Sequence, residues 1–251
     1  MPTGSDHRLP RLHVAESLAA GKELELDRQA AHYLGTVLRL RPGARLRLFN
    51  VRSGEGEAVL LALDRKGARC RVLQLLRLPD RDPVVDVWLV FAPVKRVANE
   101  WVVEKATELG VTRLLPVITR RSQTRRINLA RWQAIAREAA EQCERLSVPE
   151  IAEPCDLATC LAQWPEGRRL YVAVERAGRP HLARRLAEEG GHGAPTALLI
   201  GPEGGFAPED LRLVDECKEA CPVSLGPRIL RAETAALFGL GLLVAHRDAA
   251  G

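Results

Sequence analysis

The sequence predicts an α/β protein in which a small β-barrel precedes a parallel sheet with helices. Two observations predict this class. Residues 1 to about 76 alternate short extended runs with turns, as expected for a small barrel. From residue 84 onward, apolar strand-like runs alternate with helical stretches, and a parallel sheet is the architecture that such alternation favours. At 251 residues, the chain is long enough for two modest domains, expected over 1–76 and 84–251.

The first predicted domain contains extended runs and a single helix. Strands are expected over 9–14, 23–26, 45–51, 58–63 and 68–75. Asp27 is placed to cap a helix that extends to Leu38, with apolar residues recurring on one face. Glycine and proline predict turns at 41–43, 53–56 and 66–67. Two prolines and alternating charges in LRLPDRDP, residues 76–83, predict a linker with neither helix nor core.

The second predicted domain alternates strands and helices. Strands are expected over 84–91, 111–117, 170–174 and 197–200, with a short one ending near Ser224, and helices over 100–109, 129–146, 180–189, 210–220 and 234–246. The last helix is apolar nearly all round, so it requires burial on several sides. Gly239 and Gly241 inside it predict close packing, either within the domain or against a second subunit.

Two glycine-containing loops follow strand-like runs in this domain. TALLIGPEGGF occupies 196–206 and SLGPRILRAETAAL occupies 224–237. Loops at the carboxyl ends of parallel strands are where open α/β sheets bind their ligands. Ordinary strand-to-helix turns are the alternative, because Pro208 suits a first helical position. Neither the phosphate-loop nor the dinucleotide motif occurs.

Basic residues gather between Glu108 and Glu138, where the chain has no acidic residue. Among the basic residues of this stretch are Arg113, Arg120, Arg121, Arg125, Arg126 and Arg131. The segment TRRSQTRR, 119–126, would follow a strand and therefore lie at the ligand edge of the sheet. Together with a formal charge of +5, it favours a polyanionic partner. A solvated basic face is the alternative.

The six cysteines show no C-x-x-C pair and no histidine at zinc-ligand spacing. We therefore expect free thiols in a reducing compartment, and no metal. No apolar run approaches the length of a membrane span, and the N-terminus lacks a signal pattern. A cytoplasmic protein without membrane contact is expected.

GPEGGF and LGPRILRAETA, together with KATELGV at 105–111 and EAAEQCERLSVPEI at 138–151, resemble the RsmE family of the SPOUT superfamily. Ala232 and Cys143 depart from the Thr and Ser that are common in that family. The resemblance covers most of the chain after residue 84. It implies a C-terminal SPOUT-type parallel sheet with a deep trefoil knot, a PUA-like RNA-binding barrel before it, and a homodimer. It also implies methyl transfer from S-adenosyl-L-methionine to N3 of a uridine in 16S ribosomal RNA of the small subunit.

The resemblance and the residue types together assign candidate site residues. Backbone groups of the two loops would read the adenine edge, and apolar side chains would enclose its ring. The cofactor-binding candidates are Leu199, Ile200, Gly201, Pro202, Gly204, Gly205, Leu225, Gly226, Ile229, Leu230 and Thr234. Because uracil N3 must lose its proton, Glu203 or Glu233 is the expected base, with Arg231 stabilising the developing negative charge. For Glu233, interaction with the N-terminus of its own helix is the alternative.

The candidate RNA-binding residues lie in three places. They are Arg8 and Arg11 at the start of the barrel, Arg120, Arg121, Arg125 and Arg126 in the basic segment, and Gln142 and Arg145 at a helix end that the resemblance places beside the substrate. An exposed strand arginine without a role and a solvated helix surface are the alternatives. Two other functions stay open: another SPOUT RNA methyltransferase, acting on ribose oxygen or on guanine in tRNA, and a non-catalytic RNA-binding module. Binding of S-adenosylmethionine would exclude the latter.

Overall fold

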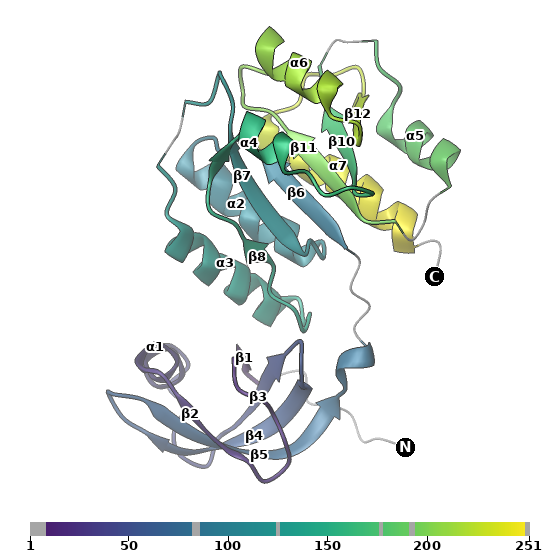
Figure 1. Cartoon of the computed structure of the whole chain (residues 1–251). Coiled ribbons are helices and arrows are strands. Elements are labelled where there is room, and N and C mark those ends of the chain that lie inside the picture. The colour runs from purple at the N-terminus through teal and green to yellow at the C-terminus, as the bar shows by residue number, and fades with distance from the viewer. Residues whose placement is uncertain (1–8, 82–85, 124–125, 176–177, 191–193, 249–251) are drawn as a thin grey trace. The chain divides into compact units, whose positions relative to one another are not determined.

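The computed structural model describes residues 9–81, 86–123, 126–175, 178–190 and 194–248 (Figure 1). The chain forms two compact units. The first comprises Met1–Pro83 together with Ala140–Val148, and the second comprises Val84–Ala139 together with Pro149–Gly251. Predictions for Arg8 and Arg125 lie outside the described residues.

The first unit is built on a five-stranded sheet with the order β1-β3-β4-β5-β2. Its strands are β1 (Arg11–His13), β2 (Glu23–Leu26), β3 (Arg45–Asn50), β4 (Gly54–Leu63) and β5 (Ala68–Arg77). β1 pairs in parallel with β3, and the other neighbours are antiparallel. Alternation along β2 buries Leu24 and Leu26 while its glutamates face solvent, as expected for a sheet with one solvent-exposed face.

The predicted helix after Asp27 is confirmed, although its second half has a different geometry. α1 (Arg28–His32) begins where Oδ1 of Asp27 accepts a hydrogen bond from Ala30 N at 2.8 Å. The chain then continues as a π-helical turn, η1 (Tyr33–Val37), which places Leu34 in the core.

Two expectations for the first unit are wrong. The turn predicted at 53–56 lies earlier, at 51–53, and residues 54–56 begin β4, in which Glu55 is buried. A buried carboxylate is tolerated there because Arg11, Arg47 and Arg77 all pair with it. The predicted linker at 76–83 contributes its first residues to β5, and Pro79–Arg81 form a 3-10 turn, η2.

The second unit contains a seven-stranded sheet in which all pairings are parallel, as predicted (Figure 1). The order is β12-β10-β11-β6-β7-β8, with β9 also beside β7. The strands are β6 (Val87–Phe91), β7 (Arg113–Ile118), β8 (Glu150–Ile151), β9 (Cys155–Asp156), β10 (Arg169–Ala173), β11 (Thr196–Ile200) and β12 (Ala220–Val223). The knot that the resemblance implies stays a prediction.

Helices pack on both faces of this sheet. They are α2 (Arg96–Glu108), α3 (Leu129–Gln142), α4 (Leu157–Ala162), α5 (Leu182–Glu189), α6 (Pro208–Glu216) and α7 (Ala232–Asp248). Alternate residues of β11 face opposite ways: Leu199 packs in a core with Leu157 of α4 and Val214 of α6, whereas Leu198 lies beneath Gly239 of α7. β11 is therefore covered on both sides, which is why it is apolar throughout.

Several boundaries differ from the expected ones for identifiable reasons. α3 ends at Gln142 rather than 146, and Glu144 has a left-handed backbone with φ of 62°. α6 ends at Glu216 because Cys217 is extended and leads into β12. α2 begins at Arg96 rather than at residue 100. Two short strands and α4, between 150 and 162, were not predicted at all, although Asp156 is a clear cap that accepts from Thr159 N at 2.8 Å.

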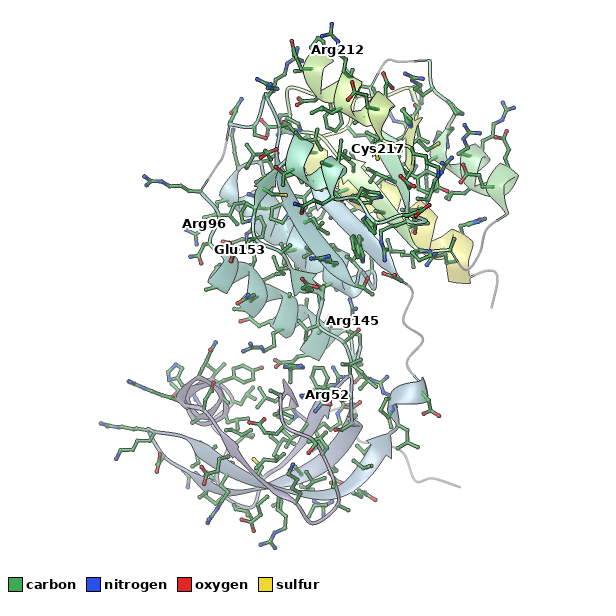
Figure 2. All side chains as sticks on the ribbon, viewed as in Figure 1. Arg52, Arg96, Arg145, Glu153, Arg212 and Cys217 are labelled. Atoms are coloured by element: carbon green, nitrogen blue, oxygen red, sulfur yellow. The ribbon has the colours of Figure 1, made fainter. Side chains whose placement is uncertain are left out.

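The side chains of the second unit include many exposed cations, among them Arg96 on α2 and Arg212 on α6 (Figure 2). The six cysteines carry free thiols, as predicted. Among the helices of the described ranges, none combines the length and the hydropathy that a membrane span needs.

Candidate functional site

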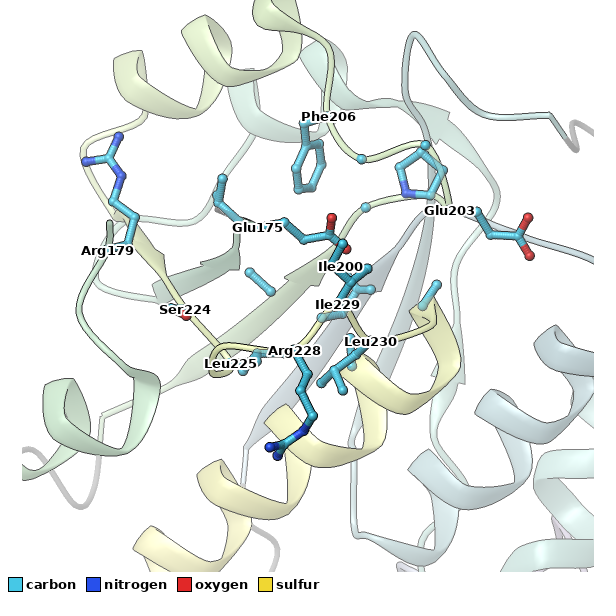
Figure 3. Close-up of a pocket in the computed structure, with 18 of the residues that line it drawn as sticks. Glu175, Arg179, Ile200, Glu203, Phe206, Ser224, Leu225, Arg228, Ile229 and Leu230 are labelled. Carbon is cyan, nitrogen blue, oxygen red and sulfur yellow. The ribbon is translucent and has the colours of Figure 1, made fainter. Parts of the chain in front are cut away.

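The carboxyl ends of three neighbouring strands, β12, β10 and β11, surround one cavity of about 530 Å³ (Figure 3). Its wall is formed by the loops that follow these strands, by the first turns of α7 and by Arg121 from the loop after β7. This is the edge of the sheet at which the sequence placed its ligand loops. The volume is in the range of sites for cofactor-sized molecules.

The loop after β11 turns sharply because of its glycines. A methyl group built on Gly201 would lie 3.0 Å from Cε2 of Phe206, so a larger residue at 201 would displace the aromatic ring from the cavity wall. The amide of Gly205 donates to the carbonyl of Pro202 at 2.8 Å, which closes the following turn. Backbone groups thus line this side of the cavity, with little side-chain bulk in front of them.

The loop after β12 supplies the apolar wall. Its turn is fixed by Ser224, whose Oγ accepts from Gly226 N at 3.1 Å, and Gly226 has a φ of 117°, which L side chains rarely adopt. Leu225, Ile229 and Leu230 line the cavity beyond this turn, and Ile229 is 58% exposed. An apolar side chain held at the rim of a concave site is a typical contact for an apolar ligand ring.

The loop after β10 also lines the cavity, and the sequence reasoning missed it. Glu175, Gly178 and Arg179 belong to this loop. Figure 3 shows the Glu175 side chain extending toward Ile200. The strand before it was predicted, so the rule that placed the other two loops at the ligand edge would also have identified this one.

Most of the predicted cofactor-binding residues lie around this cavity. Its lining includes Ile200, Gly201, Pro202, Gly204, Gly205, Leu225, Gly226, Ile229 and Leu230. Leu199 does not line it, because this residue points into the core between β11 and α4. Thr234 is exposed on the first turn of α7 and also lies outside the lining.

The three predicted catalytic residues have different positions. Glu203 lines the cavity wall, but Figure 3 shows its carboxylate directed away from Ile229 and Leu230. Arg231 is exposed immediately before α7, where its carbonyl accepts from Ala235 N at 2.8 Å. Glu233 lies in the first turn of α7, a position where a carboxylate stabilises the helix N-terminus.

The predicted RNA-binding residues do not form one group. Arg120, Arg126 and Gln142 are exposed. Arg121 is exposed but donates to the carbonyl of Gly204. Arg145 is half-buried, and its Nη2 donates to Ser147 Oγ at 2.8 Å.

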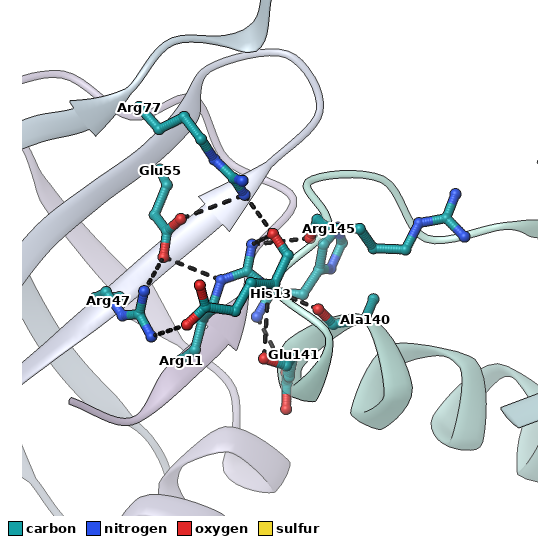
Figure 4. Close-up of polar contacts among 9 residues, drawn as sticks. Arg11, His13, Arg47, Glu55, Arg77, Ala140, Glu141 and Arg145 are labelled. Atoms are coloured by element: carbon teal, nitrogen blue, oxygen red, sulfur yellow. Dashed lines mark hydrogen bonds and ion pairs between the residues drawn. The ribbon is translucent and has the colours of Figure 1, made fainter. Parts of the chain in front are cut away.

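The expected exposure of Arg11 is wrong, because this side chain is buried inside the first unit (Figure 4). Its Nε donates to Glu55 at 3.0 Å, Nη1 to the carbonyl of Ala140 at 2.6 Å and Nη2 to that of Arg145 at 2.8 Å. The guanidinium also lies 3.5 Å from the ring centroid of Phe49. Burial lowers the pKa of this guanidinium, and Glu55 opposes that shift. Arg11 therefore holds the segment Ala140–Val148 against the sheet of the first unit.

Within the described ranges, His, Cys, Asp and Glu side chains nowhere gather in a group of three or more that could hold a metal ion.

Two domain families match this chain. The RNA methyltransferase domain matches residues 80–244, and the RNA methyltransferase PUA domain matches residues 26–73. The chain is 32% identical over 231 residues to the ribosomal RNA small subunit methyltransferase E of Rickettsia conorii, covering 92% of this chain and 93% of that protein. It is 33% identical over 234 residues to the Synechocystis protein of the same name, covering 92% and 75%.

Solved structures are similar over nearly the whole chain. A methyltransferase from Legionella pneumophila, solved in complex with the cofactor SAM, aligns with a TM-score of 0.84 at 32% identity, covering 95% of this chain and 98% of that one. A ribosomal RNA small subunit methyltransferase E from Neisseria gonorrhoeae, bound to S-adenosyl methionine, aligns with a TM-score of 0.82 at 28% identity, covering 95% and 98%.

Proposed function

This chain belongs to the family of ribosomal RNA small subunit methyltransferase E proteins, and we propose that it acts on a uracil base. The methyl group of S-adenosyl-L-methionine would be transferred to N3 of a uridine in 16S ribosomal RNA. The observation that carries the proposal is the cavity at the carboxyl ends of β11 and β12, to which both glycine-containing loops contribute. The two domain families that this chain matches support it, and so do two similar solved structures that are named as bound to this cofactor.

The residues around the cavity fit this cofactor. Ile200, Ile229 and Leu230 offer apolar surface for the adenine ring, and the backbone of both loops offers donors and acceptors for its edge. Glu175 offers a carboxylate for the ribose hydroxyls or the ammonium group. When bound, S-adenosylmethionine supplies a methyl group on a sulfonium sulfur, ready for in-line displacement.

The protein's main task in such a transfer is to position the two reactants and exclude water. The acceptor nitrogen carries a proton at neutral pH, so a base must remove it before or during attack. Glu203 or Glu233 is the candidate base. Arg231 is the candidate for stabilising negative charge on the uracil oxygens as that proton leaves.

The RNA itself is expected to be held by cations around the cavity mouth. Arg120 is exposed next to Arg121, which lines the wall, and Arg126 is exposed later in the same segment between β7 and α3. Phosphate contacts of this kind position the nucleic acid without reading its sequence. A structured RNA surface, such as the small ribosomal subunit, should therefore be a better substrate than a short oligonucleotide.

The test uses S-adenosylmethionine with a radiolabelled methyl group and small subunits that lack the modification. After digestion to nucleosides, the label should migrate as 3-methyluridine. Label in a ribose methyl or in guanine would show a related methyltransferase with another acceptor. If calorimetry detects no saturable binding of S-adenosylmethionine, the protein is a non-catalytic RNA-binding module and the proposal is wrong.

A further inference from the structure

Two adjacent arginines follow β7, and their side chains have different surroundings. Arg121 donates a hydrogen bond from Nη1 to the carbonyl oxygen of Gly204, at 2.8 Å. Its aliphatic stem lies against the same glycine, since a methyl group built on Gly204 would be 3.7 Å from Cδ of Arg121. The Arg120 guanidinium is exposed, and no residue in the described part of the chain pairs with it.

The turn that carries both arginines is held in place by polar contacts. Thr119 N donates to Ser122 Oγ at 2.9 Å, and Ser122 N donates back to the carbonyl of Thr119 at 3.2 Å. Asp210 is buried and accepts from Arg120 N at 3.3 Å and from Ala207 N at 3.0 Å. One buried carboxylate therefore joins the backbone of this turn to the backbone at the start of α6.

Gly204 belongs to the cavity wall that Arg121 also lines. The orientation of its peptide group decides which way the backbone donors and acceptors of the 202–205 turn face. A hydrogen bond to the Gly204 carbonyl fixes that orientation before a ligand arrives. Groups that are already ordered lose less conformational entropy on binding, so this contact favours cofactor affinity.

We infer that Arg121 is a positioning residue for the cofactor, and that Arg120 and Arg126 make the phosphate contacts. The inference rests on the proposed function, because it takes S-adenosylmethionine as the ligand of the cavity. A phosphate that recruited Arg121 would have to replace its bond to Gly204. Arg120 and Arg126 are exposed and have no such bond to lose within the described ranges.

The adjacent substitutions Arg121→Gln and Arg120→Gln test this division, because both remove one charge from the same turn. Calorimetry measures the affinity for S-adenosylmethionine without RNA, and a transcript of small-subunit ribosomal RNA is bound over a series of salt concentrations. Arg121→Gln should weaken cofactor binding roughly tenfold and leave the salt dependence unchanged. Arg120→Gln should leave cofactor affinity unchanged, and log affinity should fall less steeply with log salt, the slope becoming less negative by roughly 0.7–0.9.

Arg121→Lys separates charge from geometry, because lysine keeps the charge but its ammonium cannot take the position of Nη1, from which Arg121 donates to Gly204. It should bind S-adenosylmethionine as weakly as Arg121→Gln, and it remains informative if the glutamine variant does not fold. Unchanged cofactor affinity in both Arg121 variants, with a smaller salt slope for Arg121→Gln, overturns this inference alone. A wild-type protein that does not bind S-adenosylmethionine overturns the proposed function as well.

Discussion

Gly239 of α7 lies directly against Leu198 of β11: a methyl group built on the glycine would be 2.6 Å from Cδ2 of the leucine. Leu198 is fully buried, so its side chain has little room to move away. Gly241, two residues later, would place the same methyl group in open space within the subunit. Of the two glycines that predicted close packing, Gly239 meets its neighbour inside the domain.

Gly239→Ala should therefore lower the free energy of unfolding by about 1–3 kcal/mol, because it overpacks the contact between α7 and β11. Gly241→Ala should raise it by up to about 1 kcal/mol, since alanine is the better helix former. Thermal melting of the two variants beside the wild type measures both effects. Equal shifts in melting temperature for the two variants would contradict the packing argument. A loss of stability in Gly241→Ala alone would show that a second subunit covers this position.

Arg11→Lys should destabilise the first unit by about 3 kcal/mol. Lysine keeps the charge but cannot contact Glu55 and the carbonyls of Ala140 and Arg145 together, which leaves buried acceptors unpaired. The control is Arg71→Lys, because Arg71 pairs with Glu23 at the surface and should change stability by less than about 0.5 kcal/mol. Denaturant titration compares the variants. A stable Arg11→Lys protein with a reduced salt slope for RNA would instead show that Arg11 contacts phosphate.

The buried thiols should resist alkylation in the folded protein. Burial raises the pKa of Cys70 to about 11 and that of Cys160 to about 12. At pH 8, the thiolate fraction of Cys70 would then be only about 0.1%, and the thiolate is the reactive form. Iodoacetamide labelling followed by mass spectrometry, with guanidinium-unfolded protein as the control, measures this. Labelling of Cys70 in the folded protein as fast as in the unfolded chain would contradict it.

The raised pKa values of Cys70 and Cys160 also predict the direction in which stability changes with pH. Because the folded pKa lies above the unfolded value near 9, burial of these thiols contributes its full stability below pH 9. That contribution is lost as the pH rises toward 11. Replacement of Cys70 by Ala should accordingly flatten the decline of melting temperature between pH 9 and 11.

Arg231→Ala should lower kcat and kcat/KM together, on the order of 100-fold, if Arg231 stabilises charge only as the uracil loses its proton. Cofactor affinity should stay unchanged, because Arg231 does not line the cavity. Single-turnover methylation and calorimetry on the same protein measure both quantities. Arg212→Ala is the control, since it removes an exposed arginine on α6 that lies outside the cavity.

Two outcomes would change the assignment of Arg231. Weak cofactor binding with early melting would show that it supports the loop structure instead. Normal turnover with normal binding would remove it from the site, and Glu203→Gln would then be the next variant to assay.

The protein should be a homodimer. α2 and α7 pack together, and they carry Val97, Trp101 and Phe238 as exposed apolar side chains. Exposed apolar residues on neighbouring helices are typical of a contact surface. Light scattering at micromolar concentration should give twice the mass of the chain, and Phe238→Glu should give a monomer. Val51→Glu, the same change at an exposed position in the first unit, should leave the dimer intact. A monomeric wild type would contradict this prediction.

Local signals in the sequence determined much of this protein. The Asp27 cap, the apolar run of β11 and the loops after β11 and β12 are each defined by residues close together in the chain. Such features depend on backbone propensity and on the period of hydrophobic residues, so they can be read before the fold is known. These local features together predicted the parallel sheet and placed the ligand loops at the carboxyl ends of its strands.

Tertiary structure alone decided what surrounds each charged side chain. The sequence distance between Arg11 and Arg145 is 134 residues, yet Arg11 is buried and donates to the Arg145 carbonyl. Glu55 near the start of β4 can be buried because three arginines from other strands neutralise its charge. The burial of a charge depends on partners that the fold brings together, and neither local propensity nor periodicity identifies those partners. For the same reason, only the fold separates Arg121, bonded to Gly204, from its exposed neighbour Arg120.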